Sequence, residues 1–175
     1  GCITRLCAMF TARADKDNTK LGMVFKLNNI VFVMDVCGTE VFKHLLGEHY
    51  QEEVEATLHG DREVALMRYR NEFNHLNTML RERPSKKDDI KAAFARFNKE
   101  FQELGSLQKM YYVYNAELRH DLQNTIHEQI YVPYAEFYEC YQNVRFTSNV
   151  DKYIQYPPDT VNDMIDVMFT GNNAG

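Results

Sequence analysis

Apolar residues recur at helical spacing along almost the whole chain, and this pattern leaves few folds open to it. Leu66, Tyr69, Phe73, Leu76 and Leu80 fall on one side of a helix. The same three-and-four spacing orders the apolar residues over 20–36, 90–107 and 118–126. Only 8 Gly and 4 Pro occur in 175 residues, which argues against a turn-rich β-sandwich. The sequence predicts an all-α protein with almost no strand.

Breaks in the pattern predict six or seven helices. The first dense helix spans 20–36, and a short one over 39–46 is followed by a long one over 48–82, which Gly60 bends or interrupts. After Pro84 the sequence predicts a helix to about residue 111, with Ser85 as its N-cap and Asp88 as the acidic partner. Asn115 caps a further helix to about residue 143, which Pro133 kinks or splits. Helices of such unequal length favour a rod-like stack of antiparallel helical hairpins over a four-helix globule.

The end of the chain is specified in most detail. An aromatic turn over 152–156 leads into two prolines and a short final helix over 159–169, capped by Thr160 with Asp163 as its partner and stopped by Gly171. Its apolar stripe consists of Val161, Met164, Ile165, Met168 and Phe169. We expect residues 151–175 to form an aromatic turn and a docked tail helix on a single α-helical unit over 1–175.

Composition excludes several classes of protein. The formal net charge of -5 argues against nucleic-acid binding, and no apolar run reaches the length of a membrane span. Four cysteines without paired spacing (Cys2, Cys7, Cys37 and Cys140) are interpreted as reduced, buried thiols of a cytosolic protein. The chain begins with Gly1 in apparently mid-helix sequence, so we expect a C-terminal fragment of a longer chain.

Several blocks of sequence, in order, resemble one family. These are Lys26-Leu27-Asn28-Asn29 before an apolar helix, Leu45-Leu46-Gly47-Glu48, FARFNKEFQEL over 94–104, Leu118-Arg119, Tyr134-Ala135-Glu136-Phe137, and above all the tail over 152–169. Together they resemble the seventy-kilodalton subunit of the exocyst complex (exocyst complex component seven), in its C-terminal region. No block is a catalytic fingerprint, but their order and spacing are hard to obtain by chance.

The resemblance implies the C-terminal end of a CATCHR-type helical rod, as found in exocyst subunits, without catalysis or a cofactor. It implies a role in exocytosis, as a vesicle-tethering subunit that is cytoplasmic and peripheral at the plasma membrane. The partners that it implies are other exocyst subunits, small Rho-type GTPases and inner-leaflet phosphoinositides such as phosphatidylinositol 4,5-bisphosphate, with no nucleic acid.

In relatives, cations at the C-terminal end bind the phosphoinositide. Here Lys152 matches one such lysine and Lys91 matches a basic position, whereas Gln155 and Ser148 stand where relatives carry lysines. Seven residues of 81–99 are Lys or Arg and three are acidic, while 40–63 has seven acidic residues and two basic ones. We therefore expect a weakened lipid-binding patch, made of Lys86, Lys87, Lys91, Arg96, Arg145 and Lys152. The alternative for each cation is solvated helix surface.

Two other functions stay open. Glu72 with His75 and Glu117 with His120 have the Glu-x-x-His spacing of di-metal carboxylate bundles, although on a helical wheel they fall away from the apolar faces. The chain could also be a purely protein-binding helical module that has lost its lipid affinity. The tyrosines at 131, 134, 138 and 141 suggest a stacking surface, but their spacing favours a seam between helices.

Overall fold

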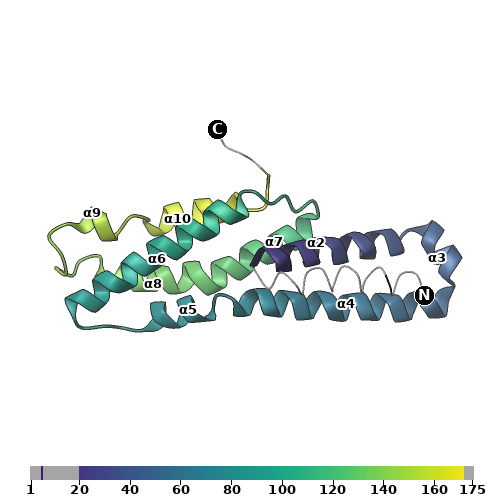
Figure 1. Cartoon of the computed structure of the whole chain (residues 1–175), viewed down its shortest axis with the longest axis horizontal. Coiled ribbons are helices and arrows are strands. Elements are labelled where there is room, and N and C mark those ends of the chain that lie inside the picture. The colour runs from purple at the N-terminus through teal and green to yellow at the C-terminus, as the bar shows by residue number, and fades with distance from the viewer. Residues whose placement is uncertain (1–4, 6–19, 172–175) are drawn as a thin grey trace. The chain divides into compact units, whose positions relative to one another are not determined.

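A computed structural model describes Arg5 and residues 20–171, and the described part of the chain is helical apart from turns and loops (Figure 1). Its longer helices are α2 (Lys20–Cys37), α4 (Glu48–Asn71), α6 (Lys87–Gln108), α7 (Ala116–Ile126) and α8 (Val132–Tyr141). The shorter ones are α3 (Glu40–Leu46), α5 (Asn74–Arg81), α9 (Val150–Tyr153) and α10 (Pro158–Asp166), with a π-helical turn η1 (His127–Tyr131) between α7 and α8. The prediction of an all-α protein is confirmed.

The chain divides into two compact units, where the sequence suggested one. Unit 1 comprises residues 1–72 and 114–118, and unit 2 comprises residues 73–113 and 119–175. The dividing point lies between Glu72 and Phe73, just after α4 ends. Each unit is described by itself below. Within the described residues, none of the helices is both long and apolar enough to cross a bilayer.

Unit 1 is built on a helical hairpin, in which α2 and α4 pack side by side and α3 connects them (Figure 1). Val24, Leu27 and Val31 of α2 are buried, as are Leu58 and Tyr69 of α4. Met23 and Met34, two of the apolar residues spaced at helical intervals over 20–36, are only half-buried. The segment 114–118 is held to α2 by the hydroxyl of Tyr114, which donates to Asp35 Oδ2 at 2.8 Å.

The long helix predicted over 48–82 ends early, and Gly60 is not the cause. Gly60 lies inside α4, where an added Cβ would meet open space. The break comes at Glu72 and Phe73, and the buried ring of Phe73 belongs to the core of unit 2. Asn71 and Asn74 flank this point and favour helix weakly. The break thus follows the boundary between the units rather than the residue with the lowest helix propensity.

The core of unit 2 is rich in aromatic rings. Phe97 of α6 stacks on Tyr134 of α8 with ring centroids 3.6 Å apart and planes within 4° of parallel. Phe94 stacks on Phe146 at 5.4 Å and meets Phe137 edge-on at 5.0 Å. All five rings are buried. Tyr134 and Tyr141 are buried, and Tyr131 and Tyr138 are half-buried, so the tyrosine row is a helix seam as its spacing favours.

Pro133 splits its helix as predicted, and a side chain from α5 compensates for the break. Proline has no N–H to donate to the carbonyl four residues earlier, which is that of Gln129. The chain widens into η1 before Pro133, and Asn77 Nδ2 donates to the Gln129 carbonyl oxygen at 3.0 Å. Asn77 Oδ1 in turn accepts from Arg81 Nε at 3.0 Å. A carbonyl in a nearly buried residue is therefore satisfied from another helix.

Of the three predicted helix caps, one is confirmed and two are wrong. Asn115 Oδ1 accepts from the backbone N–H of Leu118 at 2.9 Å, as an N-cap should. Ser85 is not the cap of α6, because Lys86 holds that position and makes no side-chain cap bond. Thr160 lies inside the first turn of α10, which begins at Pro158, and Pro157 is its N-cap. Proline at the first helical position sets the start of α10, since its fixed φ suits a helix.

The final helix packs on unit 2 by apolar contacts and is tied by backbone bonds. Val161, Ile165, Met168 and Phe169 are buried. Gln123 Nε2 donates to the carbonyl oxygens of Asp166 at 3.0 Å and Met168 at 2.9 Å. Val113 N donates to Phe169 O at 3.0 Å, beside an isolated antiparallel bridge between Tyr112 and Thr170. Gly171 follows with φ of 68°, and an added Cβ would lie 3.1 Å from the Tyr112 ring, so glycine is strongly favoured there.

The cysteines fit their predicted role in part. Cys37 is a buried thiol whose pKa is raised by burial and by the nearby charge of Glu55. Cys140 of α8 is exposed, which corrects the expectation that it is buried. Cys2 and Cys7 lie outside the described residues.

We expect Asn77→Ala to lower the free energy of unfolding by about 0.5–1.5 kcal/mol, because it removes the hydrogen bond from Asn77 to the Gln129 carbonyl oxygen. Urea denaturation followed by circular dichroism measures this. Thr78→Ala is the matched control, since Thr78 is an exposed neighbour on α5 and should change stability by less than about 0.5 kcal/mol. Equal effects from both variants would show that the bond to Gln129 contributes nothing.

Candidate functional site

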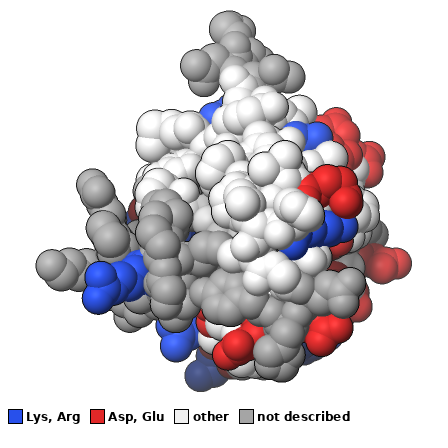
Figure 2. Space-filling view, turned by 90° about the vertical axis from the view of Figure 1, so that its right-hand side faces the viewer, with Lys and Arg blue, Asp and Glu red and all other residues white. Residues whose placement is uncertain are grey.

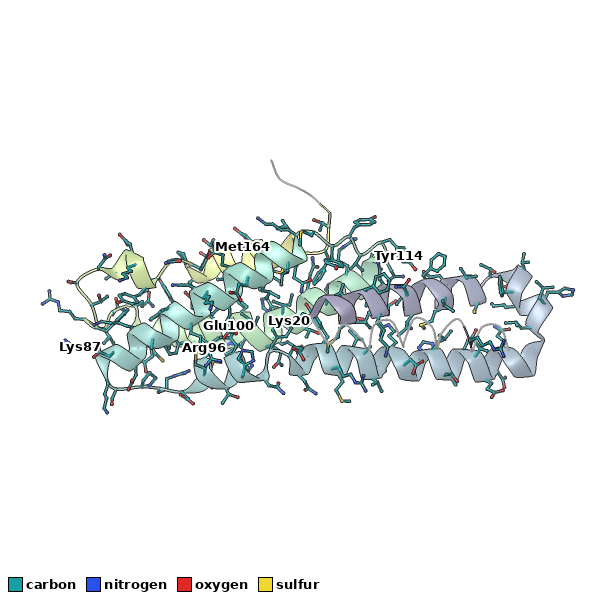
Figure 3. All side chains as sticks on the ribbon, in the orientation of Figure 1. Lys20, Lys87, Arg96, Glu100, Tyr114 and Met164 are labelled. Atoms are coloured by element: carbon teal, nitrogen blue, oxygen red, sulfur yellow. The ribbon has the colours of Figure 1, made fainter. Side chains whose placement is uncertain are left out.

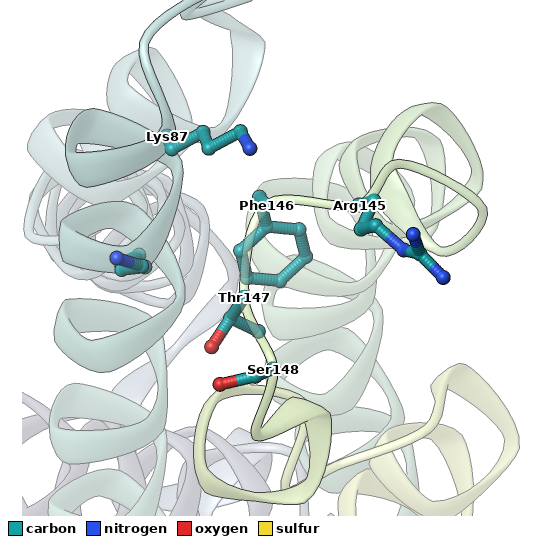
Figure 4. A pocket seen from close by; sticks show the side chains of 6 residues that line it. Lys87, Arg145, Phe146, Thr147 and Ser148 are labelled. Atoms are coloured by element: carbon teal, nitrogen blue, oxygen red, sulfur yellow. The ribbon is translucent and has the colours of Figure 1, made fainter.

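An open pocket of about 650 Å³ lies in unit 2, beside the beginning of α6. Two elements line it, the first turns of α6 and the segment 145–148 that leads from α8 to α9 (Figure 4). Its lining residues are Lys87, Lys91, Arg145, Phe146, Thr147 and Ser148. Three of the six predicted cations therefore line one pocket, although 54 positions separate Lys91 from Arg145 in the sequence and the Arg145 guanidinium points away from the loop hydroxyls (Figure 4).

The Phe146 ring anchors the loop side of this pocket. Phe146 is 2% exposed, stacks on Phe94 of α6, and meets the Tyr153 ring of α9 edge-on at 6.2 Å. With this ring fixed, its neighbours Arg145 and Ser148 stay at the surface. Asn98 adds a second tie between the same elements, since its Nδ2 donates to the Tyr153 carbonyl oxygen at 2.8 Å. The loop thus holds its place against α6 through packing rather than through charge.

The polar groups of the pocket are donors suited to an oxyanion. Lys87 and Lys91 stand one helical turn apart, so their ammonium groups reach the same side of α6. The hydroxyls of Thr147 and Ser148 lie on the side of the loop that faces the helix carrying Lys87 (Figure 4). Lys91 Nζ also pairs with Asp88 Oδ1 at 3.1 Å, and this carboxylate partly neutralises the positive charge of the pocket. Ammonium and hydroxyl donors together favour a phosphate or a similar anion.

The remaining predicted cations lie outside this pocket. Lys86 is exposed and directly precedes α6, while Lys152 is exposed on α9, with its ammonium 5.6 Å from the centre of the Tyr153 ring. Arg96 is nine positions from Lys87, which at about 100° per residue puts it on the opposite side of the helix. It lies with Glu100 near the middle of α6, whereas Lys87 lies at its beginning (Figure 3).

Arg96 takes part in a charge cluster of its own. Its Nε donates to Glu100 Oε1 at 2.9 Å, and His75 Nε2 of α5 lies 2.7 Å from Glu100 Oε2. Partial burial raises the pKa of Glu100, but hydrogen bonds from Arg96 and His75, with their charges, outweigh this and hold that pKa below its usual value. His75, one member of a Glu-x-x-His pair, is thus engaged with Glu100.

The described residues contain no group of three or more His, Cys, Asp or Glu side chains that could hold a metal ion. Glu117, from the second Glu-x-x-His pair, lies 3.9 Å from Arg62 Nη2 within unit 1. Both pairs therefore have one member engaged with a residue outside the pair.

Sequence reasoning missed the hydroxyl side of the pocket. Thr147 and Ser148 belong to no periodic pattern and carry no charge. In the sequence, Ser148 is notable only because relatives have a lysine at that position. The one available signal was Phe146, the only aromatic residue of the connector over 142–152. A large aromatic residue in a connector indicates that the connector packs against the hydrophobic core at that point.

The end of the hairpin in unit 1 has a different surface. Figure 2 views the molecule from the side on which α3 lies, and both acidic and basic side chains lie at the edges of a largely uncharged area. None of the residues of α3 is buried, and Val41 and Leu45 are 68% and 73% exposed. The exposed Val41 and Leu45 therefore add apolar surface to a helix that also carries the Glu40–Lys43 ion pair, and the cationic pocket of unit 2 has no counterpart among the residues of α3.

Comparison with known proteins agrees with the helical fold. Residues 1–167 match the family that is described as the C-terminal part of the Exo70 exocyst complex subunit. Exocyst complex component 7 of Drosophila melanogaster is 34% identical over 80 residues, which are 46% of this chain and 12% of that protein. Exocyst complex component 7 of Homo sapiens is 32% identical over 87 residues, or 50% of this chain and 12% of that protein.

A solved structure gives the same result for the fold. A chain from the structures of exocyst subunit Exo70p and the Exo84p C-terminal domains superposes with a TM-score of 0.63 at 21% sequence identity. It covers 83% of this chain, which in turn covers 28% of that structure. The chain belongs to the Exo70 C-terminal family. This is a family of structural exocyst subunits and not of enzymes.

The lowered pKa of Glu100 predicts a pH dependence of stability. A carboxyl whose pKa falls on folding stabilises the protein above its unfolded pKa of about 4.3, and this contribution disappears as the pH falls through the lower folded value. We expect Glu100→Gln to reduce stability at pH 7 and to flatten the loss of stability below about pH 4.3. Urea midpoints between about pH 3 and pH 7 measure it.

Glu103→Gln is the control for this experiment, because Glu103 is an exposed carboxylate on the same helix. It should leave the pH profile of the parent chain almost unchanged. A Glu100→Gln profile parallel to that of the parent would contradict the role assigned to Arg96 and His75.

Proposed function

We propose that this chain is the C-terminal part of an exocyst subunit that tethers secretory vesicles, and that its cationic pocket contacts a phosphoinositide of the inner leaflet. The alignments cover only 12% of the length of the two animal relatives named above, so the work of the whole subunit enters here as a proposal. The observation that carries the lipid contact is the convergence of Lys87 and Lys91 on one pocket, with Arg145 on its loop side.

The chemistry of the pocket suits a phosphomonoester on a lipid headgroup. Such a group carries close to two negative charges and several acceptor oxygens, to which the lysine ammonium groups and the loop hydroxyls can donate. Each lysine or arginine near an anionic membrane contributes about 1 kcal/mol, so the pocket alone supports weak binding. Exposed Lys86 and Lys152 lie on the elements that border the pocket and are available to add to it.

Two features keep this contact weak. Gln155 gives no cation, and its Nε2 donates to the Lys152 carbonyl oxygen at 3.0 Å, which helps to order the turn. Asp88 pairs with Lys91 and has to yield part of that interaction to a bound phosphate. Arg96, held by Glu100 on the opposite side of α6, is left out of the proposed lipid contact.

Assembly with other proteins strengthens weak binding. Further lipid or protein contacts in a complex raise the effective concentration of each site, so modest affinity here is sufficient. We propose a cytoplasmic protein that is peripheral at the plasma membrane, with other exocyst subunits and small Rho-type GTPases as its partners. We also propose that residues 1–175 form the C-terminal piece of a longer chain.

A second candidate function is a purely protein-binding helical module. The exposed Val41 and Leu45 on α3 favour it, because side chains one helical turn apart present a small apolar surface to solvent. This candidate needs no lipid, and it predicts that vesicle binding is absent or independent of the pocket lysines.

Vesicle flotation tests the lipid contact. We expect Lys87→Glu with Lys91→Glu to reduce binding to vesicles that contain phosphatidylinositol 4,5-bisphosphate by at least about fivefold, because attraction becomes repulsion. Binding of the parent chain should also weaken as salt rises.

A charge-matched control separates the pocket from overall charge. Lys99→Glu with Lys109→Glu makes the same change at exposed positions outside the pocket, one on α6 and one just after it, and it should lower binding far less. Equal losses in the two double variants would indicate nonspecific attraction. Binding that neither variant changes would move the contact elsewhere.

A further inference from the structure

Ser148 combines three properties that suggest more than a hydrogen-bond donor of the pocket. It is exposed, it lies in the non-helical segment between α8 and α9, and it lines the same pocket as Lys87 and Lys91. Its hydroxyl lies on the side of the loop that faces the helix of Lys87 (Figure 4). The neighbouring Thr147 is half-buried, and its Oγ1 accepts the backbone N–H of Asn149 at 3.1 Å. Ser148 is therefore the more accessible hydroxyl.

The surrounding sequence suits modification. Arg145 stands three residues before Ser148 and is exposed, and its guanidinium is directed away from the hydroxyls of the loop (Figure 4). Many serine/threonine kinases select their substrates by charge, and an arginine at this spacing is one common choice. An enzyme that recognises Arg145 from outside the pocket would thus find Ser148 within reach.

We propose that Ser148 is a phosphorylation site, and that its phosphoryl group occupies the cationic pocket and so blocks it to an external phosphate. Ser148 Oγ would attack the γ-phosphorus of ATP in an arginine-directed protein kinase. The bond from that phosphorus to the bridging oxygen of the β-phosphate breaks, ADP leaves, and a carboxylate of the kinase takes the hydroxyl proton. The product carries about 1.5 to 2 negative charges near pH 7, on roughly three acceptor oxygens.

The pocket provides a preformed binding site for the phosphoryl group. Lys87 and Lys91 supply two ammonium groups, and α6 begins at Lys87 with no side-chain cap on its first N–H groups. The positive end of a helix favours an anion, and α6 is 22 residues long. Asp88 and Asp89 in that first turn oppose it, which makes the balance sensitive to the two lysines. Phe146 holds the backbone beside Ser148, so the loop loses little entropy when the phosphate docks.

This inference rests on the proposed lipid contact for its biological sense, but its structural part can be tested alone. Phosphoserine is installed at position 148 of the full 175-residue chain, and its pKa is measured by phosphorus NMR titration. A free phosphoserine has a second pKa of about 6, and nearby cations lower it. We expect a value about one unit lower at position 148, and a return toward about 6 when Lys87→Gln and Lys91→Gln are added.

Phosphoserine at Ser106 is the matched control, because Ser106 is exposed on α6, the helix that carries Lys87 and Lys91, and lies outside the pocket. We expect phosphoserine 148 to reduce flotation with phosphatidylinositol 4,5-bisphosphate vesicles at least about fivefold and phosphoserine 106 to reduce it less than about twofold. The inference is overturned if the pKa of phosphoserine 148 is not lowered, or if the two lysine substitutions leave that pKa unchanged. This holds whatever the result of the vesicle flotation. A shifted pKa in a chain that never binds vesicles supports the inference and defeats the lipid proposal.

The modification itself has a direct test. We expect an arginine-directed kinase with ATP to phosphorylate Ser148, as mapped by mass spectrometry, and Arg145→Gln to slow incorporation at least about fivefold. Modification at other serines with none at Ser148 would contradict the proposal. Circular dichroism of the Arg145→Gln chain confirms that the fold is retained.

Discussion

Stacked aromatic rings between α6 and the segments around α8 are the interaction on which unit 2 depends. Phe97 on Tyr134 and Phe94 on Phe146 form two near-parallel pairs, and Phe137 meets Phe94 edge-on. Buried rings contribute through their large apolar area and add about 0.5–1.5 kcal/mol per well-oriented pair. Because Phe146 lies beyond the end of α8, the same stack also fixes the loop that leads to α9.

The candidate site follows from that stack. Lysines prefer to stay hydrated, so Lys87 and Lys91 remain at the surface while Phe94, one turn further on α6, enters the core. The loop that carries Thr147 and Ser148 comes to face them because its phenylalanine has to be buried. Packing therefore brings together polar groups that have little attraction for one another, and the resulting surplus of donors suits an anion. If the chain is part of the exocyst, as proposed, this candidate anion site lies close to a membrane.

The sequence was sufficient for the helices and for some of their ends. The spacing of apolar residues follows burial directly, so the helices were predictable. The cap at Asn115 and the break at Pro133 were predictable as well, because each depends on the chemistry of that one residue. The break at Phe73 was not, because it depends on a core to which the rest of α4 does not belong. Proximity in sequence groups Arg96 with the pocket lysines, although helix phase puts it on the far side of α6. The pocket needed the structure, since residues near 90 and near 147 meet only through the stack of Phe94 on Phe146.

In this account an uncharged ring holds the proposed anion site together, and one measurement tests this most directly. It is the affinity of Phe146→Ala for vesicles with phosphatidylinositol 4,5-bisphosphate, at a temperature where circular dichroism shows the chain to be folded, with Phe146→Leu beside it. We expect Phe146→Ala to lose most of the binding although no charge has changed, and Phe146→Leu to retain more of it. Unchanged binding in a folded Phe146→Ala chain would show that the ring does not hold the site together.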